Sequence, residues 1–247
     1  MSYTPADWVK LTAGSWATHI GYELVDPQLN RNYSMSYMFT NGPFFHTGVK
    51  AEAFYNSSSF MIGIANPTDF KYVPDGVINK KFLLAQYSYA PSDYFKAYIN
   101  YVGGQAIDTS KSKQLDLVIT SKLSGKFSLA VNGTLNRTTA YLGNKTYAGA
   151  ANWWGTAVYL NYDPSGFFGL TLREEYFNDD NGLKMFSGTP GGGSILATTL
   201  SASFKVDNFI FIPEFRVDNT SSSIFSAKDN KATKTAANVL LAAIYQF

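Results

Sequence analysis

Hydrophobic and polar residues alternate along most of the chain with a period of two. The segment QLDLVITSKL (114–123), for example, places Leu115, Leu117 and Ile119 on one face and mainly polar residues on the other. This is the period of a β-strand, whose successive side chains point to opposite faces of a sheet. The pattern therefore predicts an all-β protein whose strands each have one apolar and one polar face.

Twelve segments of this kind follow one another, and nearly all contain about 9–12 residues. They lie near 9–17, 45–55, 59–66, 81–90, 94–103, 114–123, 127–136, 154–163, 167–177, 194–206, 208–218 and 236–247. Strands of soluble proteins average about 5–6 residues, whereas a tilted strand needs about 9–11 to cross a bilayer. We therefore expect a transmembrane antiparallel up-and-down β-barrel of about 12 strands, with its apolar face toward lipid.

Short and long polar links alternate between these segments. The long links lie near 18–43, 67–80, 104–113, 137–152, 178–193 and 219–235. Transmembrane barrels show this alternation, with short turns on the periplasmic side and long loops outside. The start of the chain, MSYTP, is expected to be the end of an earlier strand. Either the twelve strands of a single barrel domain, 1–247, close by themselves, or the chain is a fragment lacking a signal peptide and further N-terminal strands.

Aromatic residues lie where the predicted strands meet the membrane surface. Pairs flank the short turns, and a second group is expected at the other interface, as in the aromatic girdles of barrels. The first set is Tyr55, Phe60, Tyr89, Phe95, Tyr162, Phe168, Phe204 and Phe209, and the second is Tyr141, Trp153, Trp154 and Tyr176. The last strand ends with Tyr245 and Phe247 on its apolar face. This ending resembles the signal by which the barrel-insertion machinery recognises its substrates.

Composition narrows the alternatives. Aromatic residues are 16% of the chain and charged residues 15%, the formal net charge is +2, and there is no cysteine. The small charge argues against nucleic-acid binding, and disulfides or thiolate metal sites are impossible. No apolar run approaches the ~18–20 residues of a membrane helix. A soluble sandwich or lipocalin-like barrel would have the same period with its apolar face inward, but strand length, link alternation and aromatic placement favour the membrane.

The polar faces of the strands would line the lumen of such a barrel. The charged pore-lining candidates are Lys50, Glu52, Lys96, Asp116, Lys122, Arg173, Glu175, Glu214 and Arg216. Charges inside a barrel need water or an opposite charge. These residues could form a structural ion-pair network or a polar rim that screens solutes. Because both signs are present, the expected channel is weakly selective.

The link 18–43 is the longest and contains unusually many apolar residues. Tyr33, Met35, Tyr37 and Phe39 are candidates for a constriction if the link folds into the lumen. Two alternatives remain open: the link could pack over the barrel mouth as a lid, or YSMSYMF (33–39) could be a short strand that extends the wall.

Of the functions considered, enzymatic activity has the least support in the sequence. An outer-membrane phospholipase would need a serine beside a histidine on the lipid-facing surface. Only His19 and His46 are available, His46 is followed by Thr47, and its face carries Lys50 and Glu52. We therefore expect neither catalysis, a metal site nor a cofactor.

The most distinctive stretches of the sequence are THIGYEL (18–24), NRNYSMSYMF (30–39) and GPFFHTGVK (42–50), followed by 159–182 and 211–219. Together they resemble the OmpL-like β-barrel porin family of outer-membrane proteins. The resemblance implies an outer-membrane porin that contacts the lipid bilayer and lets small hydrophilic solutes or ions diffuse passively. The alternatives are a non-conducting barrel that acts as an anchor or partner in an envelope assembly and, less favoured, a phospholipase-type hydrolase.

Overall fold

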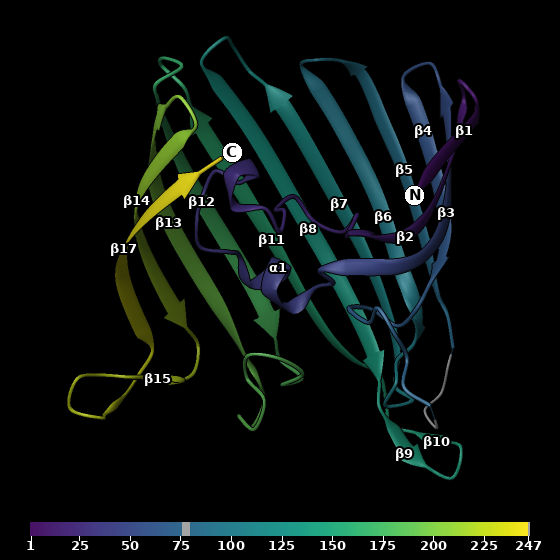
Figure 1. Ribbon diagram of the computed structural model, residues 1–247. Helices are drawn as coiled ribbons and strands as arrows, with labels where there is room; N and C mark the ends of the chain where they lie inside the picture. The colour runs from purple at the N-terminus through teal and green to yellow at the C-terminus, as the bar shows by residue number, and fades with distance from the viewer. Residues whose placement is uncertain (76–79, 247) are drawn as a thin grey trace.

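Thirteen antiparallel strands form one continuous curved sheet in the computed structural model, which describes residues 1–75 and 80–246 (Figure 1). In sheet order, which is also chain order, they are β1 (Ser2–Ala6), β2 (Val9–Ala17), β3 (Phe45–Tyr55), β4 (Ser58–Ala65), β5 (Phe82–Ser92), β6 (Phe95–Gln105), β7 (Lys111–Lys122), β8 (Phe127–Thr139), β11 (Ala151–Tyr162), β12 (Phe168–Asp179), β13 (Gly193–Val206), β14 (Phe209–Thr220) and β17 (Thr235–Tyr245). All twelve predicted strands are confirmed. The thirteenth, β1, contains the N-terminal segment expected to belong to a strand.

The predicted alternation of short and long links is confirmed except between β6 and β7, where a long link was expected over 104–113 but the strands continue and leave only 106–110, as short as the turn 163–167. Short turns meet at one end of the sheet and long links at the other (Figure 1). In two of the tightest turns, Asn56 and Asp207 adopt φ angles of 49° and 50°, a left-handed conformation that these two residue types tolerate well. Two long links contain hairpins that the sequence did not predict, β9 (Tyr141–Gly143) with β10 (Thr146–Tyr147) and β15 (Phe225–Ser226) with β16 (Ala232–Thr233).

The sheet is polar inside and apolar outside. Mid-strand aliphatic residues such as Leu117 and Val158 are each 42% exposed on the outer face, whereas their polar neighbours Asp116 and Asn161 are buried. A soluble barrel would have the opposite arrangement. The apolar face therefore has the exposure expected of a surface that lipid covers.

The aromatic residues mostly follow the predicted girdles, with one correction. Tyr55, Phe60 and Phe209 are exposed beside short turns, and Trp154 is exposed near the other end of the strands. Trp153, expected in the outer girdle, is instead completely buried. Because successive residues of a strand face opposite sides, Trp153 and Trp154 cannot both face lipid. Tyr245 is exposed at the end of β17, and Phe247 lies outside the described residues.

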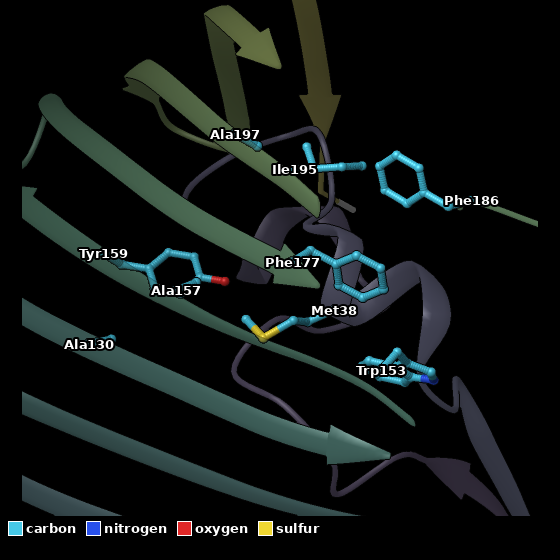
Figure 2. Packing of buried hydrophobic residues seen from close by; sticks show 9 residues of the cluster. All are labelled: Met38, Ala130, Trp153, Ala157, Tyr159, Phe177, Phe186, Ile195 and Ala197. Atoms are coloured by element: carbon cyan, nitrogen blue, oxygen red, sulfur yellow. The ribbon is translucent and has the colours of Figure 1, made fainter. Parts of the chain in front are cut away.

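The row of strands has two ends, β1 and β17, which are not paired with each other within the described part of the chain. Two hydrophobic clusters lie inside the curved sheet. One gathers Met38, Trp153, Phe177, Phe186 and other residues around the short helix α1 (Tyr37–Asn41), as Figure 2 shows. Residues 1–75 and 80–246 include no helix with the length and hydropathy needed to span a membrane.

Candidate functional site

The link between β2 and β3, residues 18–44, runs through the interior of the sheet (Figure 1). It leaves β2 at the long-link end and carries a 3-10 turn, η1 (Pro27–Leu29). Near the short-turn end, Arg31 makes two hydrogen bonds of 2.6 and 2.7 Å with Asp163, the first residue after β11. The chain then returns through α1 to β3. We call residues 18–43 the inward loop; they neither lie over the barrel mouth nor add a strand to its wall.

Carboxylates on the strands bind the backbone of the inward loop. Glu214 on β14 accepts hydrogen bonds from the amides of Tyr33 and Ser34, at 2.8 and 3.0 Å. Glu175 on β12 accepts from the first two amides of α1, both at 2.8 Å. Ser36 caps the same helix, its hydroxyl accepting from the amide of Phe39. These contacts satisfy amides that a helix start leaves without intrahelical partners.

Arg173 on β12 binds both the inward loop and the neighbouring strand β13. Its Nη1 atom donates to Glu23 Oε1 at 2.5 Å and to the Ser34 carbonyl at 2.7 Å, and Nη2 donates to Thr199 on β13 at 3.0 Å. The side chains of Arg173 and Glu23 are 0% and 4% exposed. A buried charge is tolerated when it is paired and hydrogen-bonded in this way.

Arg216 on β14 makes a second connection. Its Nε donates to Asp218 at 2.8 Å and its Nη1 to the carbonyl of Met35 at 2.8 Å. The guanidinium lies 4.8 Å from the ring centre of Tyr37, whose hydroxyl donates to Asp218. Both sides of the loop's return segment are therefore bound to the wall.

Asp116 on β7 holds the first part of the loop. It accepts hydrogen bonds from the side-chain amides of Asn100 and Asn132, both at 2.7 Å, and from the backbone amide of Gly21 at 3.0 Å. Among the described residues, no lysine or arginine forms an ion pair with it. Neutral donors alone therefore stabilise this buried carboxylate.

The nine predicted pore-lining residues thus fall into three groups, according to what they contact. Five bind the inward loop or the groups beside it: Asp116, Arg173, Glu175, Glu214 and Arg216. Lys50 and Glu52 form a half-buried ion pair of 3.2 Å on β3. Lys96 and Lys122 are exposed at the short-turn end. The sequence did not predict the roles of Glu23, Arg31 and Asp163. For Glu23 and Arg31, charged residues inside an apolar link were a usable signal; Asp163, in the turn after β11, gave none.

The four predicted constriction residues lie along the loop rather than around one narrow point. Tyr33 is partly exposed, Met35 and Tyr37 contact Arg216, and the buried ring of Phe39 packs against Phe44 with centres 5.4 Å apart. Met38, in the same apolar part of the loop, belongs to the buried cluster with Trp153, Ala157 and Phe177 (Figure 2).

The two histidines lie together where the loop leaves β2. Their ring centres are 5.3 Å apart; His46 Nε2 lies 3.2 Å from the Thr18 hydroxyl, and His19 Nε2 lies 3.0 Å from the Tyr101 carbonyl oxygen. Burial lowers the pKa of His19 to about 4; the Tyr101 hydrogen bond opposes this shift and the positive charge of Lys50 adds to it. Within the described chain, Nδ1 of His46 has no partner, so the group that would orient a catalytic histidine is missing.

Two polar cavities lie on opposite sides of the inward loop. The long-link vestibule has a volume of about 330 Å³ and includes Asp69, Phe82, Asp108, Gln114, Asn136 and Lys184. The short-turn vestibule has about 210 Å³ and includes Tyr22, Asp93, Lys96, Lys122, Ser128 and Asn161. Between them a cavity of about 10 Å³ lies against Gly21, Gly42 and Asp116. This space holds at most about one water molecule.

A third open cavity, of about 470 Å³, lies between the loop and the edge strand β17. Tyr37, Arg216 and Asp218 contribute to its wall, together with Asn238 and Leu240. The space between the loop and β17 is therefore much larger than the cavity of about 10 Å³ between the loop and β7.

Comparison with known proteins assigns the class. A family model described as "Putative beta-barrel porin-2, OmpL-like" matches residues 1–247. The chain belongs to this family, which confirms the resemblance seen in the sequence, and it is an outer-membrane β-barrel protein. Its short turns accordingly face the periplasm and its long links the exterior. No curated protein sequence matches it.

Solved structures agree on the fold. In-vitro folded OmpT, an outer membrane protein of Vibrio cholerae, is similar with a TM-score of 0.67 and 11% identity over 99% of this chain and 86% of that one. OpdQ of Pseudomonas aeruginosa is similar with a TM-score of 0.50 and 12% identity, over 98% of this chain and 75% of that one. OccK2 of Pseudomonas aeruginosa, solved in complex with glucuronate, has a TM-score of 0.51 and 14% identity, over 95% of this chain and 66% of that one. At these identities the likeness establishes the fold alone.

Proposed function

We propose that this protein is a weakly selective channel through which small hydrophilic solutes or ions diffuse passively across the outer membrane, and that the inward loop is its constriction. The observation that carries the proposal is the pair of polar vestibules on opposite sides of one loop. Two open cavities at opposite ends, separated by one loop, are the arrangement expected of a channel with a constriction.

The way in which the loop is held supports a movable constriction. Its attachments to β7, β12 and β14 include many hydrogen bonds from the strands to loop backbone. Such bonds can be exchanged for water. Opening must also withdraw Met38 from the apolar cluster that it shares with Trp153 and Phe177. Opening requires displacement near Gly21 and Gly42, where the two vestibules approach each other.

Weak selectivity follows from the mixture of charges beside the proposed path. Lys96 and Lys122 lie with Asp93 in the periplasmic vestibule. Asp69 and Asp108 lie with Lys184 in the outer one. Charges of both signs cancel much of the field that would separate anions from cations.

The second candidate is a non-conducting barrel that serves as an anchor or partner in the envelope, and the small central cavity favours it. An enzyme is not proposed, because His46 is buried and lacks an orienting partner in the described chain.

Planar-bilayer recording under a salt gradient separates the two candidates. If the protein is a channel, we expect discrete current steps and a reversal potential far from the equilibrium potential of either ion alone. The double variant Lys96→Gln with Lys122→Gln should shift the reversal potential toward the equilibrium potential of the cation. Protein that is folded by circular dichroism yet gives no current, even after Glu214→Gln weakens one attachment of the loop, would establish the non-conducting barrel instead.

A further inference from the structure

The wall of the long-link vestibule carries a patch of four uncharged polar side chains. Ser112 faces Thr138 and Gln114 faces Asn136 across neighbouring positions of β7 and β8. Asn136 Nδ2 donates to the Ser112 hydroxyl at 3.1 Å, and the Thr138 hydroxyl donates to Asn136 Oδ1 at 2.8 Å. These bonds hold the patch in a fixed arrangement.

The patch keeps hydrogen-bonding capacity for a ligand. Gln114 uses its amide nitrogen to donate to Thr134, while its Oε1 accepts no hydrogen bond from the described part of the protein. Amide and hydroxyl groups can each both donate and accept, as the hydroxyls of a polyol do. Facing pairs on one sheet surface lie about 5 Å apart and successive pairs about 7 Å apart, on the scale of a sugar ring.

The charged groups in the rest of the vestibule wall are poorly suited to bind a charged ligand. Asp69 is engaged by the backbone amides of Phe44 and Phe45, and Asp108 by Ser110. Lys184 is the lysine in this lining, and no arginine contributes to it, so the two-pronged donor that best binds carboxylates and phosphates is missing from the described vestibule.

Phe82 forms an apolar part of the same wall, but it is only 4% exposed. Its ring packs closely on β6, where a Cβ added to Gly104 would lie 2.6 Å from a ring carbon. The hydroxyls of a ligand therefore meet the polar patch rather than this ring.

We infer that the long-link vestibule binds neutral polyhydroxylated solutes of monosaccharide to disaccharide size, which names the substrate class of the channel and rests on the proposed function. The volume of about 330 Å³ is at the lower end of the range for small-molecule sites. Polar groups from β7 and β8 orient the hydroxyls.

Saturation-transfer NMR on the protein in detergent micelles, with maltose as the probe, tests the site without requiring conduction. We expect maltose to bind, glucuronate to bind at least tenfold more weakly, and Gln114→Leu with Asn136→Leu to weaken maltose binding at least tenfold. Ser112→Phe should abolish binding by filling the cavity. Thr120→Val, in the periplasmic vestibule, is the matched control and should change nothing.

Equal or tighter binding of glucuronate overturns the inference, as does maltose binding that Ser112→Phe leaves unchanged. Bilayer recording on the same preparation keeps the two proposals apart. Current without maltose binding contradicts the sugar site alone, whereas maltose binding without current contradicts the channel alone.

Discussion

Arg173 on β12 and Glu23 in the inward loop form an ion pair of 2.5 Å between side chains that are almost completely buried. The two residues are 150 positions apart in the chain. The pair lies beside the loop contacts of Glu175 and Glu214, so charged groups of the wall act together as attachments for the loop rather than as a free pore lining.

Replacing Arg173 by Met should destabilise the protein by about 3–5 kcal/mol, because Glu23 is then left buried without its partner. The double variant Arg173→Met with Glu23→Gln should recover a large part of this loss, since it removes both charges. Urea unfolding of the protein in lipid vesicles measures both. Equal stabilities of the single and double variants would show that the pair is not coupled.

Glu214→Gln should raise the open probability of the channel by roughly tenfold. The amides of Tyr33 and Ser34 donate to different oxygens of Glu214, and glutamine keeps only one acceptor oxygen, so one of the two bonds is lost. This loss costs about 1–2 kcal/mol, and 1.4 kcal/mol corresponds to tenfold. Single-channel recording measures the change. The matched control is Glu174→Gln, a carboxylate that binds Thr198 instead of the loop and should leave gating unaltered.

Lowering the pH should favour release of the inward loop. His19 has its pKa lowered to about 4 in the closed arrangement, and in water its ordinary pKa is about 6.5. Between these values the released loop binds more protons, so the closed state is fully favoured above pH 6.5 and progressively loses stability as the pH falls toward 4. We expect roughly tenfold more openings at pH 5 than at pH 7. His19→Gln should remove this part of the pH response, and an undiminished response would contradict the role of His19.

The strands were predictable because their signal is local and repeated. Each strand shows its period of two over about ten residues, and a shift by one residue would turn every side chain to the wrong face. This is why Asp116, Arg173 and Glu214 could be placed on the inner face from the sequence. The residues that they bind could not be predicted, because Gly21, Glu23 and Tyr33 lie 95 to 181 positions away in a link without a periodic pattern.

The outer face of the sheet gives a separate prediction about the membrane. Leu117→Arg, in the middle of β7, should destabilise the protein by about 2–4 kcal/mol, as charges do at the middle of a bilayer. Leu142→Arg is the matched control, because Leu142 is exposed in the β9 hairpin beyond the strands. Unfolding in vesicles measures both, and equal effects would contradict the placement of the lipid-facing surface.

The most direct measurement locks the inward loop to the wall while current is recorded. Asn32 donates to Ser201 on β13 at 2.7 Å, and the natural chain has no cysteine, so Asn32→Cys with Ser201→Cys introduces a single pair of thiols. A short, reducible bis-thiosulfonate cross-linker can then join them. We predict that cross-linking stops the current steps and that a reducing agent restores them. Current that is the same in the locked and released states would contradict the claim that the inward loop is the constriction.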